Sequence, residues 1–190
     1  MINKKDVYKL GDIATFSQGI QVGLKEQLKE PKDGYVRFIR IVDYTQNTKD
    51  IRYVKDPGEK YFVDEDDIVM VRYGSPGLIG RGKKGVIANN MFQIKPKVDF
   101  LTKDYLVHYL SQPHIQLFLS TQGSSTMPAL NFQQLKTVDV KVPSIEVQNK
   151  IVVNLNKLNT DFYSAQQILN EKLNLLVELK NSIHESNFIF

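Results

Sequence analysis

The chain has 190 residues, of which 42% are apolar and 24% charged, and this composition suits one globular domain with an appended segment. It contains no cysteine, which excludes disulfides, thiolate zinc sites and a cysteine nucleophile, and its three histidines are too scattered for a metal cluster. The sequence shows neither a signal peptide nor a run of about 18 apolar residues, so we expect a cytoplasmic protein without a membrane span.

The net charge of +4 is unevenly distributed. Residues 1–100 hold 18 Lys/Arg against 14 Asp/Glu, whereas residues 101–190 hold 7 of each. The window from Arg72 to Lys97 contains six basic residues and no acid, and it follows an acidic cluster at 64–67. Two interpretations stay open for this window: an ordinary solvated surface, or a basic face that binds a polyanion such as DNA.

The part of the chain before Pro143 is expected to form a mixed α/β body. Segments rich in β-branched residues predict strands at 36–42, 67–73, 85–88, 91–94 and 137–142. Helical spacing predicts helices at 102–111, 114–119 and 132–135, the first with Thr102 as its N-cap. The stretch 74–85 is rich in turn residues, so we expect no regular structure there.

Glycines recur at every third position of this stretch, from Gly74 to Gly80, ahead of a Lys-Lys pair. The pattern lacks the Gly-Lys-Ser/Thr ending of a P-loop, and no helix follows it. Its glycines suit a β–β connection with unusual dihedrals. A second interpretation is a basic loop that contacts a DNA backbone or groove. That interpretation assigns DNA contacts to Tyr73, Ser75, Arg81, Lys83 and Lys84.

The end of the chain is predicted to be one long helix, from Ser144 as its candidate N-cap to about Glu185, roughly 60 Å long. Apolar residues recur there at alternating spacings of four and three, which is the heptad pattern of a coiled coil. Lys172 interrupts the pattern; either it fixes register or partner, or its stem lies along the seam while its amine reaches water. The residues expected to dimerise are Ile151, Leu155, Leu158, Phe162, Leu169, Leu176, Leu179 and Ile183.

The sequence offers no catalytic constellation. Asp161, Glu178 and Lys180 imitate a nuclease carboxylate–lysine set, but their positions on one helix lie too far apart for a shared metal. Signatures of amino-methyltransferases and of dinucleotide-binding sites are missing. We therefore expect a protein that is not an enzyme and holds no metal.

Several short motifs follow one another in a set order along the chain. They are Tyr8–Ile13 with Gly19, Phe38–Ile41, Asp67–Met70, Gly74–Gly82, Asn89-Asn90, Gln122–Thr126, Leu130, Leu135, Val140–Pro143 and Glu146–Ile151. This order resembles one family, the specificity (S) subunit of type I restriction–modification systems. One departure is Val147, where the family usually has Glu before the glutamine.

The resemblance implies a DNA target recognition domain at 1–143 and a conserved spacer helix at 144–190. It implies a non-catalytic subunit that reads one half of a split double-stranded DNA target and positions modification (M) methyltransferase subunits, with the restriction (R) subunit as a further candidate partner. S-adenosylmethionine is expected on the M subunit and no cofactor on this chain. Family members typically carry two such units, so this chain is expected to be a half-subunit, either natural or a fragment, that forms an antiparallel homodimer.

The sequence also leaves one alternative, a coiled-coil adaptor whose α/β body binds a protein or a small ligand. Under the DNA-binding interpretation, further contacts come from segments that mix amide, aromatic and cationic side chains. These contacts are Gln18, Gln21, Lys25, Arg40 and Tyr44.

Overall fold

The computed structural model describes residues 7–46, 48–121, 129–130 and 132–187. The chain forms two compact units, Met1–Gln148 and Asn149–Phe190. The first unit is a mixed α/β body, and the second contains most of the helix α6 (Ile145–Asn187). A mixed α/β body followed by one long helix confirms the predicted fold class.

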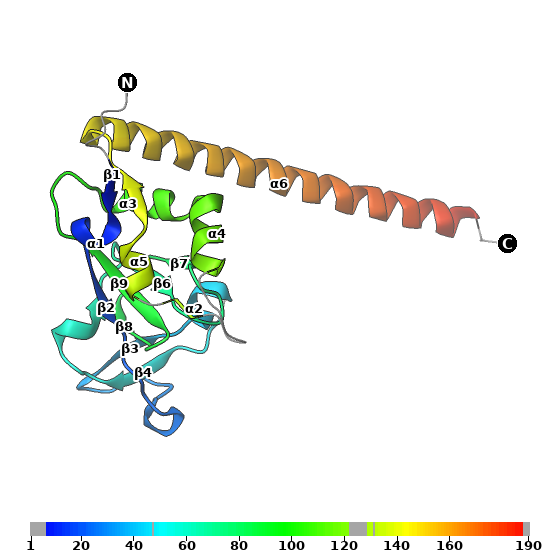
Figure 1. Ribbon diagram of the computed structural model, residues 1–190. Helices are drawn as coiled ribbons and strands as arrows, with labels where there is room; N and C mark the ends of the chain where they lie inside the picture. Colours follow the sequence, from blue (N-terminus) through cyan, green and yellow to red (C-terminus); the bar gives the residue numbers. More distant parts are fainter. Residues whose placement is uncertain (1–6, 47, 122–128, 131, 188–190) are drawn as a thin grey trace. The chain divides into compact units, whose positions relative to one another are not determined.

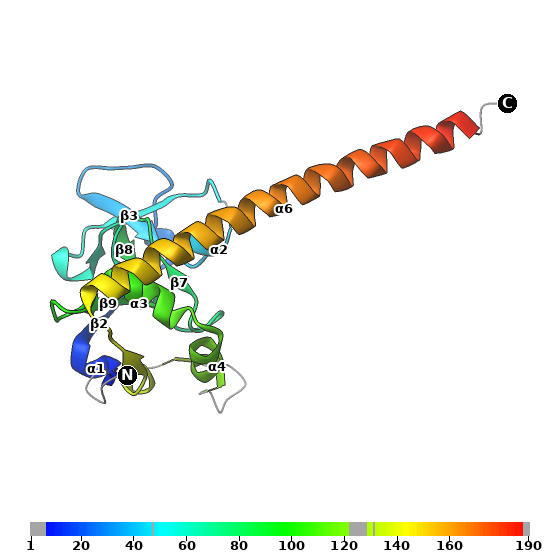
Figure 2. The same ribbon diagram turned by 90° about the horizontal axis from the view of Figure 1, so that it is seen from above.

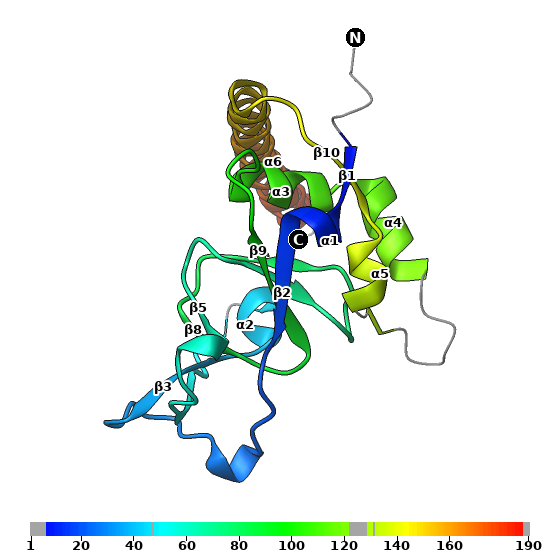
Figure 3. The same ribbon diagram turned by 60° about the vertical axis from the view of Figure 1, so that its left-hand side comes forward.

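The described residues of the body form three β-sheets (Figures 1 and 3). The smallest pairs β1 (Val7–Lys9) with β10 (Asp139–Lys141). The second sheet is antiparallel throughout, in the order β2 (Ala14–Gln18), β9 (Met91–Pro96), β6 (Ile68–Val71) and β7 (Ile79–Gly80). The third has the order β4 (Arg52–Lys55), β3 (Tyr35–Ile39), β8 (Gly85–Ile87) and β5 (Phe62–Val63), with β3 and β8 parallel.

Short helices connect these strands. They are α1 (Leu10–Ile13), η1 (Leu24–Glu26), α2 (Val42–Thr45), η2 (Glu59–Tyr61), α3 (Lys103–Leu110), α4 (Pro113–Thr121) and α5 (Phe132–Lys136). Thr102 caps α3 as predicted, because its Oγ1 accepts a hydrogen bond from the backbone N–H of Tyr105 at 3.3 Å. The loop that carries η1 lies at the end of the body opposite β1, α3 and α4 (Figures 1 and 3).

The core has two layers because successive residues of a strand point to opposite faces of its sheet. All four residues of β6 are buried. Val69 and Val71 join a cluster with Phe38 and Val86 of the third sheet. The opposite face of the second sheet meets helices, since Phe92 of β9 stacks on Phe132 of α5 with ring centroids 4.4 Å apart. A strand buried on both faces explains why this segment is continuously apolar in sequence.

Two sequence predictions for the body need correction, and several strands were not predicted. The strand predicted at 36–42 ends at Ile39, because the buried Asp43 carboxylate accepts the backbone N–H of Arg40 at 2.8 Å and turns the chain into α2. The stretch 74–85 is not wholly irregular, since it holds the short strand β7 paired with β6. Patterning also missed β1, β2, β4 and β5, of which β5 has only two residues.

The helix α6 is one uninterrupted element of 43 residues (Figures 1 and 2), about 65 Å long. It begins at Ile145, so Ser144 occupies the predicted N-cap position and its carbonyl accepts the Gln148 N–H at 2.9 Å. The buried Gln148 amide is fully used: Nε2 donates to the carbonyls of Phe100 and Pro143, and Oε1 accepts from Thr102. These bonds fix the first turn of α6. Among the described residues, no helix is apolar over enough length to cross a membrane.

Candidate nucleic-acid interface

Four polar side chains from three separate segments of the body meet at its surface, and we call them the amide cluster. Gln18 ends β2 and Gln21 follows three residues later, whereas Tyr73 lies just after β6 and Asn89 lies between β8 and β9. Gln18, Tyr73 and Asn89 are half-buried and Gln21 is exposed. The strand ends therefore present amide and hydroxyl groups from a rigid sheet, which is how loops commonly position binding residues.

Hydrogen bonds connect all four members of the amide cluster. Gln18 Nε2 donates to the Asn89 carbonyl at 2.8 Å. Asn89 Nδ2 donates to Gln21 Oε1 at 3.2 Å, and Tyr73 Oη donates to Asn89 Oδ1 at 3.4 Å. Carboxamides suit the donor–acceptor pattern that adenine presents in the major groove. The cluster is therefore a candidate surface for reading base edges.

The backbone beneath the amide cluster is locked by close packing at Gly19. The Gly19 N–H donates to Met91, the Ile20 N–H to Ile87, and the Asn89 N–H to Ile20, over 2.8 to 3.1 Å. A Cβ atom built on Gly19 would lie 2.6 Å from the Ile87 carbonyl carbon, so only glycine fits. This close contact between the two backbone segments holds Gln18 and Gln21 against the turn that carries Asn89.

Arg72 places a positive charge beside the amide cluster. Its guanidinium carbon lies 5.9 Å from the centre of the Tyr73 ring and 5.8 Å from that of Phe92, and its Nε donates to the Leu130 carbonyl at 3.2 Å. Within the described residues, no carboxylate forms an ion pair with it. A cation stacked on aromatic rings keeps its charge and favours a nearby anion such as phosphate.

Most other cations of the basic window are paired with carboxylates of the same chain. Arg81 pairs with Asp104, and Lys84 lies 3.0 Å from Asp64. The hydrogen bond to Asp64 raises the pKa of Lys84. Lys83 instead lies over the Tyr44 ring, 5.7 Å from its centre. Carboxylates of the same chain thus offset most of the positive charge that would attract an external anion. DNA contact by Arg81, Lys83 and Lys84 stays a prediction.

The predicted contacts just before α2 and within it, Arg40 and Tyr44, are also engaged. Arg40 lies 3.2 Å from Asp43 and 3.1 Å from Asp50, so contact with a base would break these ion pairs. Tyr44 is half-buried, and burial raises the pKa of its hydroxyl to about 12. Lys25 on η1 and Ser75 in the glycine-rich loop are exposed. DNA contact by all four stays a prediction.

A buried carboxylate organises the acidic cluster beside the basic window. Asp67 is 3% exposed and accepts hydrogen bonds from Lys103 at 2.7 Å, Gln93 at 2.8 Å and the backbone N–H of Asp64 at 3.0 Å. Burial alone would raise the pKa of Asp67, but the bonds from Lys103 and Asp64 outweigh it and lower that pKa. The network joins α3 to the β5–β6 turn and is structural.

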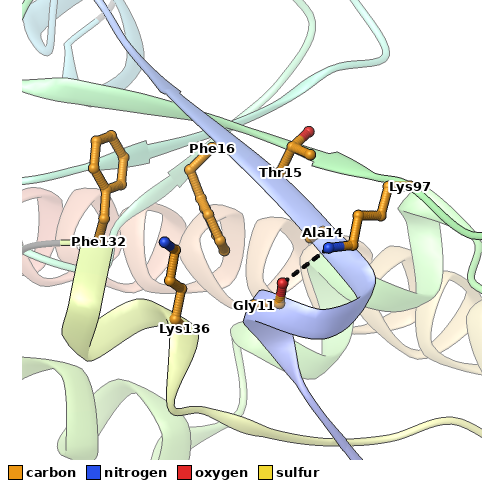
Figure 4. Close-up of a pocket in the computed structure, with 7 residues that line it drawn as sticks. All are labelled: Gly11, Ala14, Thr15, Phe16, Lys97, Phe132 and Lys136. Carbon is orange, nitrogen blue, oxygen red and sulfur yellow. Dashed lines mark hydrogen bonds between the residues drawn. The ribbon is translucent and has the colours of Figure 1, made fainter.

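A separate hollow of about 290 Å³ lies beside α1, β2 and α5 (Figure 4). Lys97 and Lys136 line it together with Phe16 and Phe132, and Lys97 donates to the Gly11 carbonyl at 3.1 Å. Two ammonium groups suit an anion better than a metal ion. In the described part of the chain, no group of three or more acidic or histidine residues could hold a metal.

The seam of α6 is largely uncovered. Ile151 and Leu155 are half-buried, whereas the other predicted dimerisation residues are 51 to 66% exposed: Leu158, Phe162, Leu169, Leu176, Leu179 and Ile183. Lys172 is exposed within the same seam. The motif at 122–126 lies outside the described residues.

Comparison with known proteins identifies the family. A family model described as the type I restriction modification DNA specificity domain matches residues 2–176. The chain belongs to this family. The type I restriction enzyme EcoBI specificity subunit of Escherichia coli is 26% identical over 186 residues, 92% of this chain and 39% of its own length.

Solved structures of this family share the fold. A chain from a study of complex assembly and conformational transition in the type I R-M system superposes with a TM-score of 0.76 at 17% identity, covering 93% of this chain and 44% of its own. The HsdS subunit from Thermoanaerobacter tengcongensis gives 0.68 at 17% identity, covering 83% and 38%. The type I S subunit from M. genitalium gives 0.58 at 13% identity, covering 84% and 41%.

This type I specificity-family chain thus spans about two fifths of the length of these relatives. The comparisons give no support to the adaptor alternative. Sequence reasoning placed Gln18, Gln21 and Tyr73 among the DNA contacts, and the structure brings these three together. It named neither Asn89 nor Arg72 as an individual contact, although Arg72 begins the window predicted to bind DNA. The Asn-Asn pair between two predicted strands was the available signal for Asn89.

Proposed function

We propose that this chain is the specificity component of a type I restriction–modification complex, reading one half of a bipartite DNA target and positioning methyltransferase subunits. The observation that carries the proposal is the family match, which runs through the body and into α6. The amide cluster beside Arg72 supplies a surface that suits base edges and phosphates together. The chain itself does no chemistry.

The partners follow from the same proposal. The modification subunit brings S-adenosylmethionine and the catalytic groups, and the restriction subunit joins when the complex cleaves DNA. Such a complex works in the cytoplasm on the DNA of the cell. In this arrangement, the residues of the body are responsible only for binding and orienting the target.

A second copy of the chain supplies the second reader. The exposed apolar seam of α6 supports helix pairing, because a heptad repeat of this length is stable only against a partner. We propose an antiparallel pair that holds two recognition bodies apart. Because a homodimer has two-fold symmetry, its target is an inverted repeat with a fixed gap of unread bases.

The test is co-expression with the matching modification subunit, followed by sequencing that maps methylated adenines. The expected result is one inverted-repeat motif that is methylated only when both chains are present. Expression of the modification subunit alone is the control. A motif with two unrelated halves would contradict the homodimer, and methylation independent of this chain would contradict the specificity role.

Binding in vitro gives a second measurement. The affinity of the complex for duplexes that carry the motif should fall steeply with salt, because each phosphate contact releases counterions. Duplexes with a scrambled motif should bind more weakly at every salt concentration. A salt-independent affinity would indicate that the body does not bind DNA.

A further inference from the structure

The hydrogen bonds of the amide cluster form a relay that ends on an exposed side chain. The Tyr73 hydroxyl donates to Asn89 Oδ1, and Asn89 Nδ2 donates to Gln21 Oε1. Gln21 is exposed, and among the described residues its Nε2 has no hydrogen-bond acceptor. The relay therefore holds the oxygen of the Gln21 amide and leaves its nitrogen available.

We propose that Asn89 is a positioning residue that holds the Gln21 carboxamide in one orientation, and that Gln21 reads an adenine in the major groove of the target. The inference rests on the proposed function and assigns one base contact within it. Asn89 acts through Gln21 and need not touch DNA itself.

The orientation matters because a carboxamide is nearly symmetric in shape but not in chemistry. Rotating the Gln21 amide by half a turn exchanges its donor with its acceptor. The bond from Asn89 uses one of the two lone pairs on Oε1, so the other lone pair and both N–H groups remain for DNA. These groups match adenine, whose N6 amino group donates and whose N7 accepts.

The other bases fit this held amide less well. Guanine presents two acceptors, N7 and O6, so one of them would face the amide oxygen. Cytosine offers only its amino group, and thymine offers one acceptor beside a methyl group. An amide held in one orientation therefore favours adenine, and a freely rotating one discriminates less.

The backbone at Asn89, in the middle of the relay, is held against the segment that leads to Gln21. The Asn89 N–H donates to the Ile20 carbonyl at 2.8 Å, and the Asn89 carbonyl accepts from Gln18 Nε2 at 2.8 Å. The turn that carries Asn89 therefore cannot move independently of the segment that carries Gln21. Ordering the reader before DNA arrives reduces the entropy lost on binding.

The experiment uses the complex with the modification subunit and a pool of duplexes with randomised positions. Sequencing of the bound fraction gives a base preference at each position. Gln21→Ala should lower the preference for adenine about 5- to 150-fold at one base pair of each half-site, which is the fold-change for about 1–3 kcal/mol. All other positions should keep their preferences.

Asn89→Ala should lower the preference at the same base pair. The double variant should lose no more than Gln21→Ala alone, because residues that act as one unit are not additive. Tyr73→Phe should show a smaller loss at that position. If Asn89→Ala does not fold, Asn89→Asp replaces it, since aspartate has the same size without the Nδ2 donor.

The matched control is Lys25→Ala, four residues beyond Gln21 on the exposed helix η1. It should weaken binding to all sequences equally and reduce the salt dependence, as expected for a phosphate contact. The inference is overturned if Gln21→Ala changes no position, if the affected base pair is not A·T, or if Asn89→Ala weakens all sequences equally. A wild-type complex that selects no motif would refute the proposed function instead.

Discussion

Replacing Gly19 with alanine tests how the body positions its candidate base readers. A Cβ atom on residue 19 would lie 2.6 Å from the carbonyl carbon of Ile87 and still closer to the carbonyl oxygens of Ile87 and Ala88. Non-bonded carbon atoms normally pack at about 3.5–4.0 Å. All three obstacles are backbone atoms, so no side chain can rotate away, and the end of β2 must separate from the β8–β9 turn.

The cost can be estimated from the hydrogen bonds that this separation breaks. Three backbone bonds join the segments, from Gly19 to Met91, from Ile20 to Ile87 and from Asn89 to Ile20. At about 1 kcal/mol each, their loss destabilises the body by about 3 kcal/mol. For a domain of this size, that corresponds to a fall in Tm of roughly 6–12 °C.

The assay is thermal unfolding followed by near-ultraviolet circular dichroism of the tyrosines, since far-ultraviolet signals would be dominated by α6. Gly23→Ala is the matched control, because Gly23 has a φ of −65° and an added Cβ would contact only the Glu26 side chain, at 3.2 Å. It should be neutral or slightly stabilising. A Gly19→Ala variant that unfolds at the wild-type temperature and selects the same DNA motif would refute this account of the interface.

Three further predictions concern the acidic network, the helix and the basic window. The pKa of Asp67 is lowered in the folded protein, so its stabilising effect is present above the ordinary aspartate pKa of about 3.9 and is lost as pH falls through the lowered pKa. Asp67→Asn should therefore flatten the acid-side fall in Tm, and an unchanged pH profile would count against this network. Phe162→Asp should yield monomers by light scattering, whereas Asn174→Asp, on the face of α6 opposite the seam, should remain dimeric. A wild-type chain that is monomeric even with its modification subunit would rule out the seam as a dimer interface. Lys83→Ala should reduce the salt dependence of DNA binding more than Lys84→Ala, because the charge of Lys84 is already offset by the Asp64 carboxylate. An equal salt dependence of affinity in the two variants would show that the Lys84–Asp64 pair is not kept on DNA.

The long helix and the positions of several strands along the chain could be predicted because local patterns encode them. The four-and-three spacing extends through most of α6, and every residue that produces it is a near neighbour in sequence. Thr102 and Ser144 mark helix starts by the chemistry of their own positions. Short strands such as β5 and β7, with two residues each, are too brief to show a period, so they became visible only in the fold.

The amide composition and the basic window are properties of the sequence itself, and they were enough to suggest a DNA-binding surface. Which residues form that surface depended on tertiary structure. The cluster joins Gln18, Tyr73 and Asn89 because β2, β6 and β9 are neighbours in one sheet, although 71 residues separate Gln18 from Asn89. The same folding placed Asp104 against Arg81, across 23 residues. A linear sequence shows which charges exist, but only the folded chain determines which of them neutralise one another and which remain available to DNA.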